Sequence, residues 1–292
     1  MIDGSEEHKN LFCKTFIETY RAYEPTELPW PELDAVSIDR LRAIPFWSAA
    51  LAAERAAGIM VTTFAQTLED PVIREAFVLQ GVEETRHARL LDVMLQHYGI
   101  PIPNVKLPKT GENERAFIDF GYEECIDAFL GMGIFGLARE IQLFIPELTD
   151  IFEVILLEEA RHVTFFVNWI AFERIRRGRG AMPAQAVSIA IGYVRAMARL
   201  VRGFAPAATQ KSDHQIGFAA EGAFEMFDDA TWRTFLQSAV DQNDHYMAVM
   251  DGRLMTPRIL PSIARGLLKL PAFPRTFAKK AATQRKRVGI AA

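Results

Sequence analysis

The stretches GVEETRHARLL (Gly81–Leu91) and LLEEARHVTFF (Leu156–Phe166) share the pattern Glu-Glu-x-Arg-His, and the two copies lie 75 residues apart. Each copy sits in a run of apolar residues with helical spacing. In each, a Glu and a His three residues apart take positions of the inward apolar stripe. These residues are Glu84 and His87 in the first copy and Glu159 and His162 in the second. Burying unpaired charge costs several kcal/mol, so something must compensate it.

Helical periodicity dominates the chain, and the sustained apolar–polar alternation of exposed strands does not occur. Hydrophobic residues make up 50% of the 292 residues, which is enough for a substantial core. We therefore expect an all-α fold. The expected helices cover about residues 45–68, 71–98, 113–144, 147–177, 183–203 and 228–250. Residues 1–44 predict one or two short helices and a Pro-rich connection, and the tail from Thr256 predicts at most short helices.

The repeated pattern is typical of a metal site. A carboxylate and an imidazole three residues apart lie on the same side of one helical turn. When two such turns face each other, one further Glu from each of two other helices completes a site for two metal ions. Four carboxylates balance the charge of two divalent ions. One further Glu is Glu54, which interrupts an inward stripe and lies as far from the turn near Glu69 as Glu84 does.

The third long helix offers several candidates for the last carboxylate. Glu140 lies about four residues before the expected break, whereas Glu159 lies about 14 after it, a mismatch of roughly 15 Å. For Glu124 the mismatch is roughly 9 Å. We therefore predict Glu124, with Glu123 as the second choice and Glu140 as the third. The competing interpretation is that Glu123, Glu124 and Asp127 form a solvated face.

These residues resemble the ligand pattern of the ferritin-like di-iron carboxylate superfamily. That superfamily includes ribonucleotide reductase small subunits, bacterial multicomponent monooxygenases, rubrerythrins and p-aminobenzoate N-oxygenases. The resemblance covers about residues 45–175, and the gap from Glu124 to Glu159 fits the usual spacing. The metal ligands that it implies are Glu54, Glu84, His87, Glu124, Glu159 and His162, with no catalytic residue beyond them.

The resemblance and the helix pattern together imply four segments. They are an N-terminal lead-in over residues 1–44, a ferritin-like di-metal four-helix bundle over 45–177, C-terminal helices packed on the bundle over 178–251, and a basic tail over 252–292.

Members of the superfamily commonly have an acidic residue just before the second ligand Glu, and a carboxylate often holds a ligand His by its outer nitrogen. The resemblance therefore implies that Glu83 and Glu158 support the site from outside. Arg86 and Arg161 are expected either to pair with these glutamates as part of the site or to form ordinary i,i+3 salt bridges.

An extra histidine ligand is a further hypothesis. p-Aminobenzoate N-oxygenases have a third His four residues before the second Glu-x-x-His motif. Here Ile155 stands at that position, so the chain departs from the N-oxygenase pattern. His214 and His245 are the alternatives for an extra ligand.

The ligand types favour iron, with manganese or a mixed manganese–iron pair as alternatives, and the resemblance implies O2 as co-substrate. The leading hypothesis is a di-iron oxygenase or oxidase that acts on a small organic substrate and takes electrons from a separate reductase. Phe77, Phe166 and Trp169 are expected to exclude water. The alternatives are a ferritin-like ferroxidase or storage protein and a degenerate, non-catalytic bundle with an empty or zinc-filled site. A homodimer is among the expected assemblies.

The segment GMGIFG (Gly131–Gly136) matches Gly-x-Gly-x-x-Gly, but no strand precedes it, so a dinucleotide site is rejected. The glycines are expected either to allow close helix packing or to leave room beside the metals for a substrate. The second hypothesis predicts that Gly133→Leu blocks turnover at unchanged metal content.

The remaining features concern location and partners. Cys13 and Cys125 follow no metal-binding or redox spacing, and the acidic N-terminus lacks signal-peptide features, which favours a cytoplasmic protein. Residues 252–292 hold ten of the 33 Lys and Arg and none of the 37 Asp and Glu. This basic tail is expected to pack on the acidic body or to contact a membrane surface or an acidic partner. The acidic body disfavours nucleic acid.

Overall fold

The computed structural model describes residues 2–44, 47–102, 104, 107, 113–179, 182–203 and 232–271. Within this part of the chain the fold is all-α, as the sequence predicts. The helices are α1 Glu6–Glu18, η1 Pro25–Glu27, α2 Ala35–Ala43, α3 Trp47–Ala65, α4 Pro71–His97, α5 Glu114–Glu140, α6 Pro146–Arg176, α7 Met182–Gly203, α9 Trp232–Ala248 and α10 Ile259–Leu268. None of the described helices is long and apolar enough to cross a membrane.

Local sequence signals explain where the long helices begin. The carboxylate of Asp70 accepts hydrogen bonds from the backbone N–H groups of Val72 and Ile73, and Pro71 occupies the first turn of α4. The side chain of Asn113 caps α5 in the same way. These caps satisfy N–H groups that have no partner inside the helix.

Two glycines let α3 and α4 approach closely as an antiparallel hairpin. A Cβ at Gly58 would lie 2.8 Å from Oγ1 of Thr85, and one at Gly81 would lie 2.5 Å from Oγ1 of Thr62. Only glycine leaves room for this reciprocal packing. Both glycines lie about one helical turn from the side chains of the candidate site, so the close approach brings the two helices together at that level.

The connection between α5 and α6 differs from the prediction. The expected helix continued to residue 144, but α5 ends at Glu140, Gln142 has a φ of 51°, and Pro146 opens α6 at its first residue. Glu124 therefore lies 16 residues before the end of α5, and Glu159 lies 13 residues after the start of α6. The difference in height falls to roughly 4.5 Å, about half of the expected mismatch.

Two apolar clusters enclose the level of the charged residues. On α4, Phe77 belongs to one cluster and Leu91 to the other, with Glu84 midway between them. The first cluster is rich in aromatic rings, and the rings of Phe77 and Trp169 meet edge to face at 5.4 Å. The charged side chains thus lie in the interior, between two water-excluding layers.

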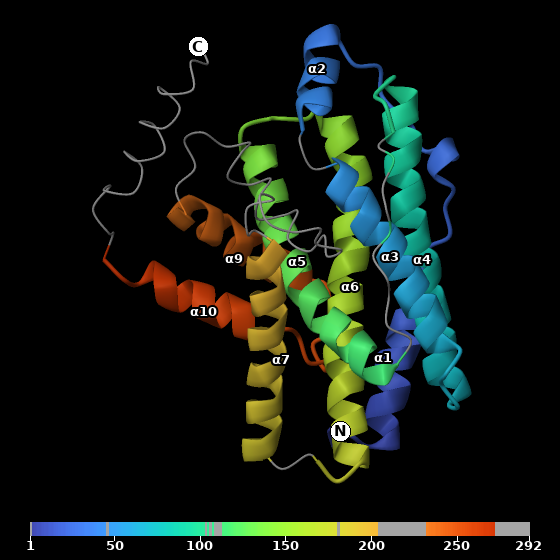
Figure 1. Cartoon of the computed structure of the whole chain (residues 1–292), viewed down its shortest axis with the longest axis vertical. Helices are drawn as coiled ribbons and strands as arrows, with labels where there is room; N and C mark the ends of the chain where they lie inside the picture. Colours follow the sequence, from blue (N-terminus) through green and yellow to red (C-terminus); the bar gives the residue numbers. More distant parts are fainter. Residues whose placement is uncertain are drawn as a thin grey trace.

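The four long helices α3, α4, α5 and α6 are covered by helices from both ends of the chain (Figure 1). α1 packs against both α4 and α6, while α7 and α9 pack against α5, and α10 packs mainly on α9. Helices that follow α6 in the sequence thus cover the α5 side, and the lead-in covers the α4–α6 side.

Candidate metal centre

Four of the six predicted ligands come together from three helices. Glu54 of α3, Glu84 and His87 of α4 and Glu159 of α6 each place one ligand atom within 4.8 Å of the others. The Nδ1 atom of His87 lies 3.0 Å from Oε1 of Glu159, 3.4 Å from Oε2 of Glu54 and 3.9 Å from Oε2 of Glu84. The two inward stripes thus meet with their polar positions at the same level.

The second histidine lies beside the same two glutamates. Nδ1 of His162 is 3.0 Å from Oε1 of Glu84 and 3.7 Å from Oε2 of Glu159. Glu84 and Glu159 therefore each present one oxygen to His87 and the other to His162. The two rings are buried, with centroids 5.7 Å apart, and neither Nδ1 has a hydrogen-bond partner among the described residues.

The outer nitrogen of each histidine is held by a buried glutamate from the other motif. Nε2 of His87 lies 2.8 Å from Oε2 of Glu158, and Nε2 of His162 lies 2.8 Å from Oε2 of Glu83. An ionised carboxylate only accepts hydrogen bonds, so Nε2 of a neutral ring carries the proton. A neutral ring would then have its lone pair on Nδ1, facing the glutamate pair, as in a metal-ligating histidine.

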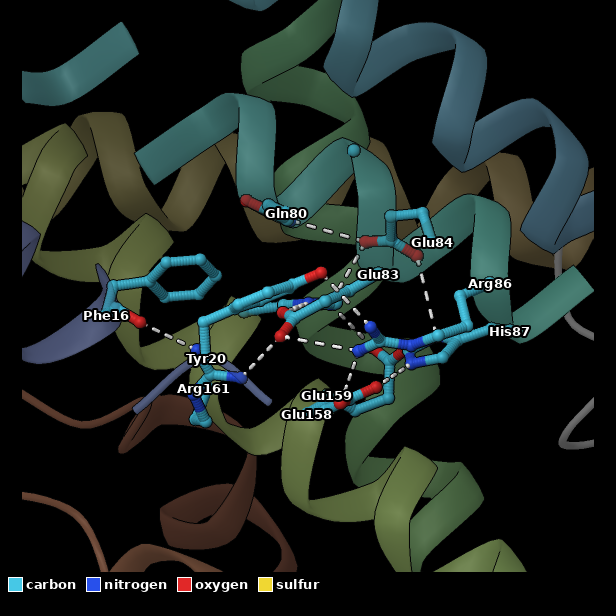
Figure 2. A network of polar contacts seen from close by, with 12 residues as sticks. Phe16, Tyr20, Gln80, Glu83, Glu84, Arg86, His87, Glu158, Glu159 and Arg161 are labelled. Carbon is cyan, nitrogen blue, oxygen red and sulfur yellow. Dashed lines mark hydrogen bonds and ion pairs between the residues drawn. The ribbon is translucent and has the colours of Figure 1, made fainter. Parts of the chain in front are cut away.

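The two arginines follow the same crossed pattern. Arg86 donates to Oε1 of Glu158, and Arg161 donates to Oε1 of Glu83, each over 2.7 Å (Figure 2). Within one motif, Arg86 and Glu83 are 3.8 Å apart. The main pairs therefore join α4 to α6, rather than being only the local i,i+3 bridges that the sequence left as an alternative.

The lead-in completes this outer layer. The guanidinium of Arg86 lies over the ring of Tyr23, 4.0 Å from its centroid, and the Tyr23 hydroxyl donates to Glu158 over 3.4 Å. Arg161 donates to the backbone oxygen of Phe16 over 2.8 Å (Figure 2). The sequence did not identify these contacts, because they join residues more than 130 positions apart or lack a motif.

The three glutamates of α5 that are candidates for the last ligand lie in different surroundings. Glu124 lines the same cavity as Glu54, Glu84 and Glu159. Glu123 forms an ion pair with Arg199 of α7. Glu140 is exposed at the last residue of α5. Of the three, Glu124 is the one that the fold brings to the cluster.

The pKa shifts reflect the crowding of buried carboxylates around the two histidines. Burial raises the pKa of Glu54 to about 7, although its contact with His87 opposes the rise. Burial, together with Glu84 and other nearby carboxylates, raises the pKa of Glu124 well above its usual value. Burial alone would lower the pKa of His87, but its contacts with carboxylates raise it well above the usual range. Bound cations would relieve this crowding of carboxylates.

A cavity of about 180 Å³ adjoins the glutamates on the side of α5. Its walls are mostly apolar and include Trp47, Phe135 and Phe152. Asp127 and Gly131 of α5 also line it, one turn apart. A Cβ at Gly131 would meet no atom within 4 Å. The arrangement is that of a small-molecule pocket beside a polar centre.

The other glycines of GMGIFG serve packing. A Cβ at Gly133 would lie 2.8 Å from the Cβ of Ala239, and one at Gly136 would lie 2.3 Å from Oγ of Ser238, both on α9. Close helix packing therefore accounts for Gly133 and Gly136, and Gly131 is the glycine of this segment that opens to the cavity.

The two alternative histidine ligands do not join the described site. His245 is exposed on α9, where its Nε2 lies 3.9 Å from Glu153. His214 lies outside the described residues, as does the basic tail beyond residue 271. The described part of that tail is partly paired, since Arg265 contacts Asp244.

Comparison of the chain with protein-family models, with curated proteins and with solved structures finds no match.

Proposed function

We propose that the chain is a metal-dependent oxidoreductase, an oxygenase or oxidase that uses two iron ions and O2 to oxidise a small organic substrate. One observation carries the proposal. Two buried Nδ1 atoms face the same pair of glutamates, each 3.0 Å from one carboxylate oxygen, while further carboxylates hold both Nε2 atoms. A neutral imidazole that donates from Nε2 has its lone pair on Nδ1, and a lone pair that faces carboxylate oxygens is stabilised by a cation between them, so the arrangement supports a pair of bound cations.

The distances support separate roles for the ligands. Glu84 and Glu159 each offer one oxygen to the side of His87 and one to the side of His162, which suits bridging carboxylates. Glu54 falls on the side of His87. Glu124 is then its counterpart for the second ion. This set matches the Glu and Glu-x-x-His ligands of ferritin-like bundles, and the hairpins α3–α4 and α5–α6 support that architecture.

Charge balance supports two ions rather than one. Glu54, Glu84, Glu124 and Glu159 carry four negative charges if ionised, and two divalent ions cancel them. The crossed pairs Arg86–Glu158 and Arg161–Glu83 are neutral as units. Oxygen and nitrogen ligands of this kind suit iron and manganese. When bound, two ferrous ions supply electrons for the reduction of O2, and an external donor is needed to restore them.

Other residues of the chain would orient the ligands, exclude water and admit a substrate. Glu83 and Glu158 fix the tautomer and the direction of the two imidazoles. The aromatic cluster around Phe77 and Trp169 keeps water from one side of the site. The apolar cavity gives a substrate direct access to the carboxylates. A metal store needs no such cavity, so this feature favours the enzyme over the storage alternative.

The test is metal analysis followed by exposure to O2. Protein loaded anaerobically with ferrous iron is expected to hold two ions per chain and to develop an oxidised-iron optical spectrum when O2 is added. Glu84→Gln and Glu159→Gln are each expected to lose both ions, because each removes a shared ligand. The matched control is Glu140→Gln, which changes an exposed Glu at the end of α5.

Several results would contradict the proposal. Iron loading below one ion per chain in the wild type would reject a di-iron site. Equal loading of Glu84→Gln and Glu140→Gln would reject the ligand assignment. Two ions that do not react with O2 would favour the non-catalytic alternative, and hundreds of irons per chain would favour storage.

A further inference from the structure

The cavity contains a carboxylate that the proposed metal pair does not use. Asp127 lies on α5, one turn after Glu124, and lines the cavity together with Glu54 and Glu159. Its Oδ1 atom is buried and has no hydrogen-bond partner within the described part of the chain. The sequence allowed Asp127 to belong to a solvated face, but the structure places its side chain on the wall of an apolar cavity.

Asp127 is a further carboxyl group beside the ligand glutamates, and burial together with the nearby carboxylates raises its pKa to about 8. A positive group beside it would favour its ionised form. Two divalent ions balance the four ligand glutamates, and the arginines nearest the histidines already pair with Glu83 and Glu158. Among the described residues that line the cavity there is no Lys or Arg. A carboxylate buried in apolar surroundings is costly unless a cation or a hydrogen-bond donor accompanies it. The bound molecule itself is the natural source of that charge.

The size and the walls of the cavity restrict this molecule. An engineered cavity of about 150 Å³ in another protein holds benzene, and this cavity is about 180 Å³. Its walls include Trp47, Phe135 and Phe152, and Gly131 leaves open space one turn beyond Asp127. The cavity therefore suits an apolar body of about the size of a substituted benzene ring, with one polar end near Asp127.

We infer that the cavity binds a small organic amine in its protonated form, with the ammonium group on Asp127 and the apolar body among the aromatic and aliphatic walls. The inference deepens the proposed function by naming the class of substrate, and it rests on that function for the charge balance. An ammonium group donates up to three hydrogen bonds, and one to an ionised carboxylate is among the stronger kinds. A protonated nitrogen has no free lone pair, so the amine is a recognition group and oxidation falls on the carbon body.

The experiment compares two probes of the same shape, 2-phenylethylamine and 2-phenylethanol, by isothermal titration calorimetry on metal-loaded protein. The wild type is expected to bind the amine at least about tenfold more tightly than the alcohol, a difference of about 1.4 kcal/mol. Asp127→Asn keeps the shape of the side chain and removes its charge. It is expected to reduce the preference to less than about threefold, with the affinity for the alcohol little changed.

Two further measurements make the test specific. Gly131→Leu fills the open space one turn away, so it is expected to weaken both probes, whereas Asp127→Asn weakens only the amine. Elemental analysis is expected to find two metal ions per chain in the wild type and in both variants. Unchanged metal content separates a substrate anchor from a metal ligand.

Each unfavourable outcome has one meaning. Equal binding of the two probes by the wild type, or an unchanged amine preference in Asp127→Asn, would overturn the inference. Loss of a metal ion in Asp127→Asn would make Asp127 a ligand, which also overturns it. A wild type without bound metal would defeat the proposed function, whereas metal-loaded protein without an amine preference would defeat this inference alone.

Discussion

The two sides of the candidate metal centre are built differently. On the side of α1, both outer glutamates have several partners: Glu158 contacts His87, Arg86 and Tyr23, and Glu83 contacts His162 and Arg161. On the side of α5, apolar walls surround a cavity, and Oδ1 of Asp127 has no partner among the described residues.

Under the proposed function, this difference separates the residues that position the metal ligands from those that receive a substrate. Buried polar groups that satisfy each other hold a single geometry, because any displacement breaks several contacts at once. An apolar cavity with one unsatisfied group has the opposite property, since its polar end is completed only when a ligand enters. Variants on the two sides should therefore fail in different ways.

The largest effect is expected on the paired side, which is the α1 side with Glu83, Arg86, Glu158 and Arg161. Arg86 and Glu158 expose only 7% and 5% of their side chains. Glu158→Ala leaves Arg86 buried without its partner and releases His87, so we expect a loss of about 3–5 kcal/mol in the free energy of unfolding. The metal affinity should fall about 10–100-fold. Chemical denaturation and metal titration measure the two effects.

The matched control for that variant is an exposed pair. Glu114 and Arg177 lie 2.7 Å apart with more than a third of each side chain exposed. Glu114→Ala should cost less than about 1 kcal/mol, because exposed ion pairs contribute little. Similar losses of stability for Glu158→Ala and Glu114→Ala would show that the buried contacts of the paired side do not hold a single geometry.

The second effect contrasts two glycines on α5. Gly133→Ala places a Cβ within 2.8 Å of Ala239, against a backbone that cannot easily move, so we expect a loss of about 1–3 kcal/mol. Gly131→Ala meets open space and removes a flexible residue from a helix, so it should stabilise the protein by about 0.5–1 kcal/mol. Thermal unfolding compares the two variants, and a destabilised Gly131→Ala would contradict an open cavity at that position.

A variant that lies outside both sides gives a baseline. Asp70 caps α4 and accepts a hydrogen bond from Lys9 over 2.7 Å. Asp70→Ala should cost about 1 kcal/mol in the free energy of unfolding, with metal content unchanged. A loss of bound metal in this variant would mean that general destabilisation, rather than the paired side, controls metal affinity.

The same residue predicts a pH dependence. Burial alone would raise the pKa of Asp70, but Lys9 and the N–H groups of α4 lower it below its usual value. Its contribution to stability is therefore complete above the unfolded pKa of about 3.9 and is lost as the pH falls through the lower, folded pKa. The difference in stability between the wild type and Asp70→Ala should shrink below about pH 4, and denaturation curves across that range measure it.

The sequence predicts the helices well because their signals are local. Apolar spacing, the cap at Asp70 and the cap at Asn113 all act within a few residues. The predicted end of α5 was wrong by four residues, because apolar residues continue past Glu140. What ends the helix is the left-handed conformation at Gln142, with a φ of 51°, and no Gly or Asn marks that position.

The same distinction between local and long-range signals applies to the candidate site. Glu54, Glu84, His87 and Glu159 could be placed together from periodicity and helix length, and the structure brings them together. Pairing of Arg86 and Arg161 with Glu83 and Glu158 was expected, but the sequence left open whether the pairs cross between α4 and α6, since i,i+3 spacing offers each arginine a local partner as well. The contact of Tyr23 with Glu158 joins residues 135 positions apart, and no sequence pattern predicts it.

Asp127 shows a different limit of sequence reasoning. It lies three residues after Glu124, so the periodicity places both on one face of the helix. Whether that face meets water or a cavity depends on how α5 packs against α3 and α6, which no local pattern determines. The choice between a solvated face and a face that lines a cavity therefore needed the structure.

The most direct test of the central claim is anomalous diffraction at the iron absorption edge from crystals loaded with ferrous iron. The account predicts two iron peaks per chain, one beside Nδ1 of His87 and one beside Nδ1 of His162, with Glu84 and Glu159 in contact with both. A single peak, or peaks only at exposed carboxylates, would contradict it.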